Sequence, residues 1–157
     1  MRKNIIQQEN QEAPSRQHGW LDLEQLAQVE VTSEEEAHPI EAAFTDGNAE
    51  GWKAAQPGEQ TIRLVFDAPQ RISWIKLLFH GNGQEHTQEF LLRWQSANDQ
   101  LYRQIVRQQY NFSPQMGSEE LETYTLELTE VRALELFIIP DISGRSAYAS
   151  LAQLRLS

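Results

Sequence analysis

The stretch Gln60-Thr61-Ile62-Arg63-Leu64-Val65-Phe66 decides the fold class, because apolar side chains occupy alternate positions along it. Successive side chains of a β-strand point to opposite faces, so Ile62, Leu64 and Phe66 share one face of an extended segment. An amphipathic helix would instead repeat its apolar residues at intervals of three and four. We therefore predict a strand here with one face turned toward a core.

The same period of two recurs to the end of the chain. The further positions predicted to face the core are Ile75, Leu77, Phe79, Phe90, Leu92, Trp94, Tyr124, Leu126, Leu128, Leu134, Leu136, Ile138, Leu154 and Leu156. Turn-forming residues separate these runs, at Asp46-Gly47, Ala68-Pro69, Gly81-Asn82-Gly83, Asn98-Asp99, Ser113-Pro114 and Pro140 to Gly144. Short strands at this spacing predict an all-β, antiparallel sandwich. The sequence contains no long helical period that would supply the crossovers of a parallel sheet.

The length of 157 residues is typical of one domain. Residues 1–19 are rich in Gln and Glu and have no apolar period, so we predict a mobile tail there and one domain over 20–157. Trp20, Leu23 and Leu26 have the spacing of a short amphipathic helical turn that leads into the domain.

Charge and composition exclude several classes of function. Acidic side chains number 23 against 13 basic ones, for a net charge of −10, which disfavours a nucleic-acid partner. Apolar residues never run for the roughly 18 positions that a membrane helix requires, so we expect no membrane partner. Residues 1–12 lack the apolar core of a signal peptide and the chain has no cysteine, so we expect a cytoplasmic protein.

Several segments resemble discoidin (coagulation factor C-type) domains. They are Ala42 to Asn48, Gly51-Trp52, Gln60 to Phe66, Thr87 to Phe90, Trp94 to Asp99 and Ala149 to Leu156, and together they span roughly residues 29–157. Arg107 to Pro114 is similar to a subgroup of uncharacterised bacterial proteins labelled carbohydrate-binding. The resemblance implies an eight-stranded jelly roll of the galactose-binding-domain-like type, with ligands bound by loops at one end and no catalytic activity.

Two histidines bracket the first candidate binding loop, since His80 and His86 lie on either side of Gly81 to Glu85. One interpretation is a solvated hairpin, because Asn82-Gly83 is a common turn pair. The resemblance instead implies that polar side chains of this loop contact a hydroxyl-rich ligand, which needs oriented donors and acceptors. The candidate ligand-binding residues are then His80, Asn82 and His86.

The second candidate loop runs from Asp141 to Tyr148 and contributes Arg145 and Tyr148. The ring of Tyr148 could pack against the C–H face of a sugar, as the resemblance implies. Alternatively, Tyr148 packs at the edge of the core and Arg145 is solvated. The binding hypothesis requires that both loops face the same way.

A calcium site is the one cofactor that the resemblance suggests. Asp46 and Asn48 could supply oxygen ligands, the type that this hard cation prefers. The sequence has Gln153 where related domains commonly place a carboxylate, so the site would lose a formal negative charge. We therefore favour an ordinary Asp-Gly turn and expect no cofactor.

Other conspicuous residues have structural interpretations. Trp52 and Trp94 are expected in the core. The acidic groups at Glu34 to Glu36 and at Glu119, Glu120 and Glu122 are expected to be solvated faces rather than glycosidase carboxylates. With no nucleophile or phosphate-binding motif present, we predict no enzyme activity. The resemblance therefore implies a non-catalytic module that recognises a carbohydrate-type ligand, with an intracellular protein-protein interaction module on the same fold as the alternative.

Overall fold

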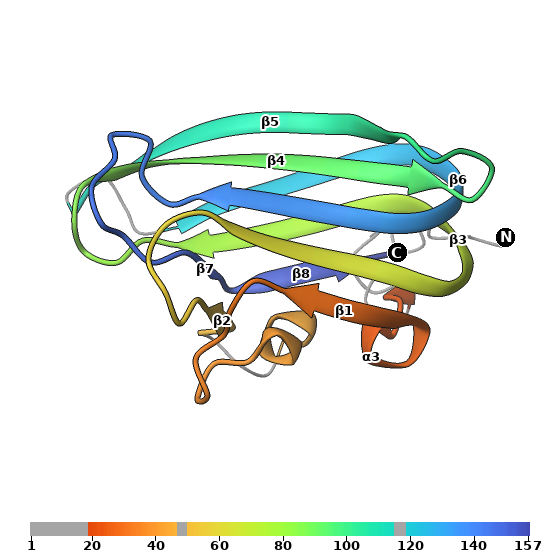
Figure 1. Cartoon of the computed structure of the whole chain (residues 1–157), viewed down its shortest axis with the longest axis horizontal. Helices are drawn as coiled ribbons and strands as arrows, with labels where there is room; N and C mark the ends of the chain where they lie inside the picture. The colour runs from red at the N-terminus through yellow and green to blue at the C-terminus, as the bar shows by residue number, and fades with distance from the viewer. Residues whose placement is uncertain (1–18, 47–49, 115–118) are drawn as a thin grey trace, which may run out of the picture.

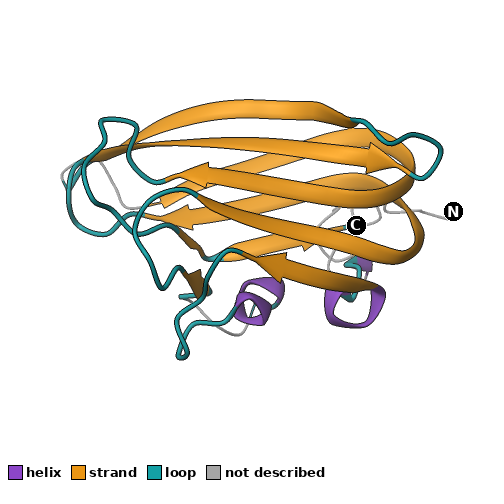
Figure 2. Cartoon of the chain, viewed as in Figure 1, coloured by secondary structure: helices purple, strands orange, loops and turns teal. Residues whose placement is uncertain are grey.

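A computed structural model describes residues 19–46, 50–114 and 119–157, and within them the chain forms an antiparallel β-sandwich (Figures 1 and 2). Almost all of the predicted tail, residues 1–18, lies outside this description. The strands are β1 (Ala27–Val31), β2 (Trp52–Lys53), β3 (Gln60–His80), β4 (His86–Ser96), β5 (Tyr102–Phe112), β6 (Glu119–Ile139), β7 (Ser150–Leu151) and β8 (Gln153–Leu156). The helices are α3 (Leu23–Leu26) and the 3-10 helix η1 (Ile40–Phe44). Within the described residues, no helix has the length and apolar content needed to cross a membrane.

Two long strands connect the layers of the sandwich. Hydrogen-bonded neighbours follow the order β1-β3-β6-β4-β5, β8 pairs with β3, and β2 and β7 form a separate two-stranded sheet. The first part of β3 pairs with the last part of β6, and the second part of β3 pairs with the first part of β6. The register shifts several times between Val65 and Trp74, where β3 passes from one layer to the other.

The core confirms the predicted strand faces. Ile62, Leu64 and Phe66 are buried, and so are nearly all of the other predicted inward positions. The exceptions, which pack against the core but are only partly buried, are Trp94, Tyr124, Leu126 and Leu128. Trp52 is fully buried, as predicted, and its indole N–H donates a 3.0 Å hydrogen bond to the carbonyl oxygen of Ser33.

Glu120 corrects the prediction of a fully solvated acidic face, because its side chain turns into the sandwich and the residue is only 3% exposed. It pairs across the sheet with Phe79, so it shares the inward face of that buried ring. Its Oε1 atom lies 3.5 Å from the side-chain nitrogen of Gln88, whereas Oε2 has no hydrogen-bond partner among the described residues. Burial, and secondly the interaction with Glu122, raises the pKa of Glu120 to about 8.

This raised pKa predicts a pH-dependent stability. The folded state holds the Glu120 proton up to about pH 8, whereas the unfolded chain releases it near the ordinary glutamate value of 4.5, so stability falls between those pH values. We expect Glu120→Gln to remove that loss and to raise the free energy of unfolding by roughly 1–3 kcal/mol at pH 9, with little change at pH 4. Urea unfolding at both pH values measures the effect. A variant that is no more stable than wild type at pH 9 would contradict the buried position of this carboxyl group.

Candidate functional site

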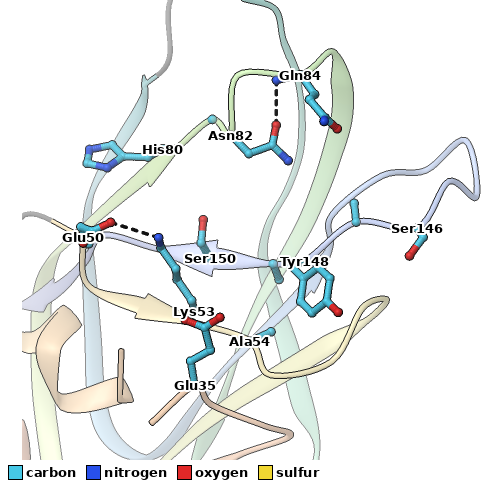
Figure 3. A pocket seen from close by; sticks show the side chains of 13 residues that line it. Glu35, Glu50, Lys53, Ala54, His80, Asn82, Gln84, Ser146, Tyr148 and Ser150 are labelled. Carbon is cyan, nitrogen blue, oxygen red and sulfur yellow. Dashed lines mark hydrogen bonds and ion pairs between the residues drawn. The ribbon is translucent and has the colours of Figure 1, made fainter. Parts of the chain in front are cut away.

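A pocket of about 390 Å³ opens where β2, the β3–β4 loop and the segment before β7 meet (Figure 3). Its lining combines polar, charged and apolar groups. The residues are Glu35, Glu50, Lys53, Ala54, His80, Gly81, Asn82, Gln84, Ser146, Ala147, Tyr148, Ala149 and Ser150. The two loops singled out from the sequence therefore face the same cavity.

The short sheet of β2 and β7 forms one wall of the pocket. Trp52 pairs with Leu151, and both side chains are buried in the core. Because side chains alternate along a strand, the next pair, Lys53 and Ser150, faces the opposite way, into the pocket. The core tryptophan thus fixes the direction in which Lys53 points.

The β3–β4 loop forms the wall opposite Lys53 in Figure 3. The side-chain oxygen of Asn82 accepts a 2.9 Å hydrogen bond from the backbone N–H of Gln84, which shapes the turn and leaves the Asn82 amide nitrogen outside that bond. At the end of β3, the Nε2 atom of His80 lies 3.0 Å from a carboxylate oxygen of Glu119 on the adjacent strand. This pair orients the His80 ring at the pocket.

The loop before β7 is held by a buried carboxylate. One oxygen of Asp141 accepts hydrogen bonds from the backbone N–H and the hydroxyl of Ser143, and the other lies 3.0 Å from Nε of Arg145. Burial alone would raise the pKa of Asp141, but the Ser143 hydrogen bonds and the Arg145 charge lower it. Farther along the loop, Tyr148 is 56% exposed and borders the pocket with its ring.

The five residues predicted to bind ligand do not all reach the pocket. His80, Asn82 and Tyr148 line it, whereas Arg145 and His86 are not among its lining residues. Arg145 is engaged with Asp141 within its own loop. His86 is only 7% exposed, stacks on the ring of Phe112 and contacts the carbonyl oxygen of Gln84 through Nδ1, so it supports the loop from beneath.

Charged residues that the sequence prediction missed complete the site. Lys53 donates a 3.0 Å hydrogen bond to Glu50, and His38 lies between Glu50 and Glu35. Hydrogen bonds from Lys53, and secondly from His38, lower the pKa of Glu50. The alternation from buried Trp52 was a sequence signal for Lys53. No comparable signal was available for Glu35, because it reaches the pocket through a turn that pairs with β2.

Asp46, named from the sequence as a possible calcium ligand, pairs with an arginine in the structure. A carboxylate oxygen of Asp46 lies 2.7 Å from a guanidinium nitrogen of Arg155, and that guanidinium also stacks over Trp20. A cation would have to compete with Arg155 for this carboxylate. Asn48 lies outside the described residues, and no group of three or more His, Cys, Asp or Glu side chains within the described part could hold a metal ion. Of the two candidate ligands, the one that the structure describes, Asp46, is thus already paired with a cation.

We therefore expect micromolar calcium to leave the melting temperature unchanged. A ligand that binds only the folded state raises stability once its concentration exceeds its dissociation constant, and a site this poor in charge belongs at about millimolar affinity or weaker. Thermal melts with chelator and with added calcium test this expectation. A clear upward shift at micromolar calcium that Asp46→Ala abolishes would contradict it.

Comparisons with known proteins identify the fold. The sequence matches no protein-family model, and no curated protein sequence matches it. Solved structures do match. The family 32 carbohydrate-binding module of C. perfringens NanJ, in complex with galactose, is 15% identical with a TM-score of 0.61, covering 87% of this chain and 96% of that one. The family 32 module of AlyQ, in complex with 4,5-unsaturated mannuronic acid, is 18% identical with a TM-score of 0.60, covering 88% and 97%. A pectin-binding module is 16% identical with a TM-score of 0.58, covering 85% and 91%. The chain therefore has the galactose-binding-domain-like β-sandwich of these modules.

Proposed function

We propose that this chain is a non-catalytic, discoidin-like carbohydrate-binding module that holds a sugar in the loop pocket. The convergence of both loops with β2 on one concave, mixed polar and apolar cavity carries the proposal. Small-molecule sites are characteristically concave, with an apolar surface and a few placed polar groups. The solved modules of the same fold include complexes with galactose and with 4,5-unsaturated mannuronic acid, which supports a ligand of this class.

The lining offers what a sugar ring requires. The Tyr148 ring presents an apolar face to the C–H side of a pyranose, and Ala54 adds apolar surface nearby. The Asn82 amide and the Lys53 ammonium group can donate hydrogen bonds to ring hydroxyls, while carboxylates such as Glu35 can accept them. A cavity of about 390 Å³ lies within the size range of small-molecule sites.

The alternative, a protein-interaction module, would be favoured by a large flat apolar surface at the loop end. Tyr148 and Ile142 are exposed there. The pocket that Tyr148 borders is concave and lined by several polar groups, and this favours the sugar. A protein captured from cell lysate by a chain that binds no glycan would support the alternative.

A glycan array followed by calorimetry on the best ligand tests the proposal. We expect Tyr148→Ala to weaken binding by about tenfold, corresponding to about 1.4 kcal/mol for the lost ring contact. Leu101→Ala is the matched control, because it removes an exposed apolar side chain from the β4–β5 hairpin at the opposite end of the sandwich. Absence of binding to every glycan, or equal losses in the two variants, would refute the proposed site.

A further inference from the structure

His38 contacts two of the carboxylates that line the pocket without lining it itself. Its Nδ1 atom lies 2.8 Å from a side-chain oxygen of Glu35, and its Nε2 atom lies 3.3 Å from one of Glu50. The other oxygen of Glu50 accepts a 3.0 Å hydrogen bond from Lys53. The imidazole therefore bridges two acidic side chains of the pocket wall.

The backbone fixes this bridge in place. The Glu35 N–H donates to the Lys53 carbonyl oxygen at 2.8 Å, and the Lys53 N–H donates to the His38 carbonyl oxygen at 3.1 Å. The His38 N–H closes the turn by donating to the Glu35 carbonyl oxygen at 2.9 Å. The His38 side chain is only 18% exposed, so the ring is packed in this arrangement rather than loose on the surface.

The chemistry of the two contacts determines the protonation state that they need. An ionised carboxylate can only accept hydrogen bonds, and a neutral imidazole carries a single N–H. Both contacts are hydrogen bonds only when both ring nitrogens carry a proton. In that state the imidazolium places a positive charge beside Glu35 and Glu50, and the Lys53 ammonium adds another beside Glu50. Loss of the imidazole proton leaves one carboxylate facing a nitrogen lone pair and removes a positive charge from between the two carboxylates.

We propose that His38, in its doubly protonated form, is a positioning residue that holds Glu35 and Glu50 in the pocket wall for the ligand. The proposal rests on the proposed sugar-binding function. It implies that protonation of His38 and ligand binding strengthen each other, because allosteric coupling is reciprocal. Among the described residues, the printed ion pairs place two charged groups against the ring, Glu35 from its own turn and Glu50 from the segment before β2, and Lys53 of β2 pairs in turn with Glu50.

The test compares the affinity for an uncharged sugar, identified on the array, at pH 5.5 and pH 8.5, which span the range where histidine changes charge. We expect wild type to bind about fivefold tighter at pH 5.5, which is the low end of typical coupling. His38→Gln, which is never charged, should bind weakly at both pH values. His38→Lys, which keeps a cation able to donate to both carboxylates, should bind tightly at both.

His80 also borders the pocket and also faces a carboxylate, that of Glu119. Both His38 variants retain the pair of His80 with Glu119. Any difference between wild type and variant in the ratio of the affinities at pH 5.5 and pH 8.5 therefore comes from His38. NMR of the ring nitrogens provides a second readout that does not depend on affinity: at pH 5.5 both nitrogens of His38 should be protonated, and saturating sugar should extend that state to higher pH.

The outcomes separate the two proposals. Sugar binding with the same pH ratio in wild type and His38→Gln overturns the role of His38 and leaves the proposed function intact. A neutral His38 ring at pH 5.5 overturns it as well. Failure to bind any sugar at either pH refutes the proposed function and this inference with it.

Discussion

We expect Leu136→Ala to lower the free energy of unfolding by about 2–5 kcal/mol, the usual cost of emptying a buried leucine site. Leu136 is 2% exposed, and it pairs with Ile62 of β3 on one side and with Leu92 of β4 on the other. Its side chain therefore lies in the middle of the sandwich, where neighbouring strands cannot close the gap without moving. Leu64→Ala should have a similar cost, because that residue is also fully buried.

Urea unfolding measures both effects. Leu101→Ala serves as the control, since that side chain is 68% exposed and its loss should change stability by no more than about 0.5 kcal/mol. A midpoint for Leu136→Ala that matches the control would show that the assignment of strand faces is wrong.

We expect Gly51→Ala to lower the free energy of unfolding at least as much as Leu136→Ala does, because the added methyl group would clash with main-chain atoms. Gly51 has φ of 65°, which favours glycine, and an added Cβ would lie 2.3 Å from the carbonyl oxygen of Leu151 and 2.5 Å from that of Ala152. Those atoms belong to the main chain and cannot rotate away as a side chain would. We expect a loss of about 4 kcal/mol or more, which is the range of exceptional single substitutions.

Gly83→Ala is the matched comparison for this clash. Gly83 has φ of 84°, but a Cβ there would meet no atom within 4 Å. Gly83→Ala should therefore lower the free energy of unfolding by only about 1–2 kcal/mol, the cost of holding an alanine in the left-handed backbone conformation. Thermal and urea unfolding of the two variants separates the contributions. Equal losses would mean that close contact with β7 is not what requires glycine at position 51.

The strand faces were predictable because burial imposes a period of two on the sequence. The same alternation also predicts that two polar residues face the core. Counting back from Phe90 puts His86 on the inward face, and counting back from Tyr124 does the same for Glu120. Chemical type alone instead predicts a ligand contact for His86 and a solvated acid for Glu120, and the structure buries both.

The two carboxylates in the charged wall of the pocket were not predictable in this way. Lys53 follows from its place next to the core residue Trp52 in β2, but Glu35 and Glu50 reach the pocket through a turn and the segment before β2, which are too short to show a period. A similar limit applies to Glu135, which is buried on the outer side of its strand between the guanidinium groups of Arg63 and Arg93. Such contacts depend on which strands become neighbours, and local sequence does not specify that.

The pairing of β3 with β6 also bears on the rate at which the chain reaches this structure. Gln60 pairs with Ile138 and Leu64 with Leu134, so the central ladder joins residues that are far apart in the sequence. The entropy of closing such long loops is lost before the contacts that compensate for it can form. Domains dominated by non-local strand pairing fold in about milliseconds to seconds, far more slowly than helical bundles. The first half of β3 has β1 on one side and takes its other partner from the last part of β6, so the amino-terminal strands cannot complete their sheet during synthesis until nearly the whole domain has left the ribosome.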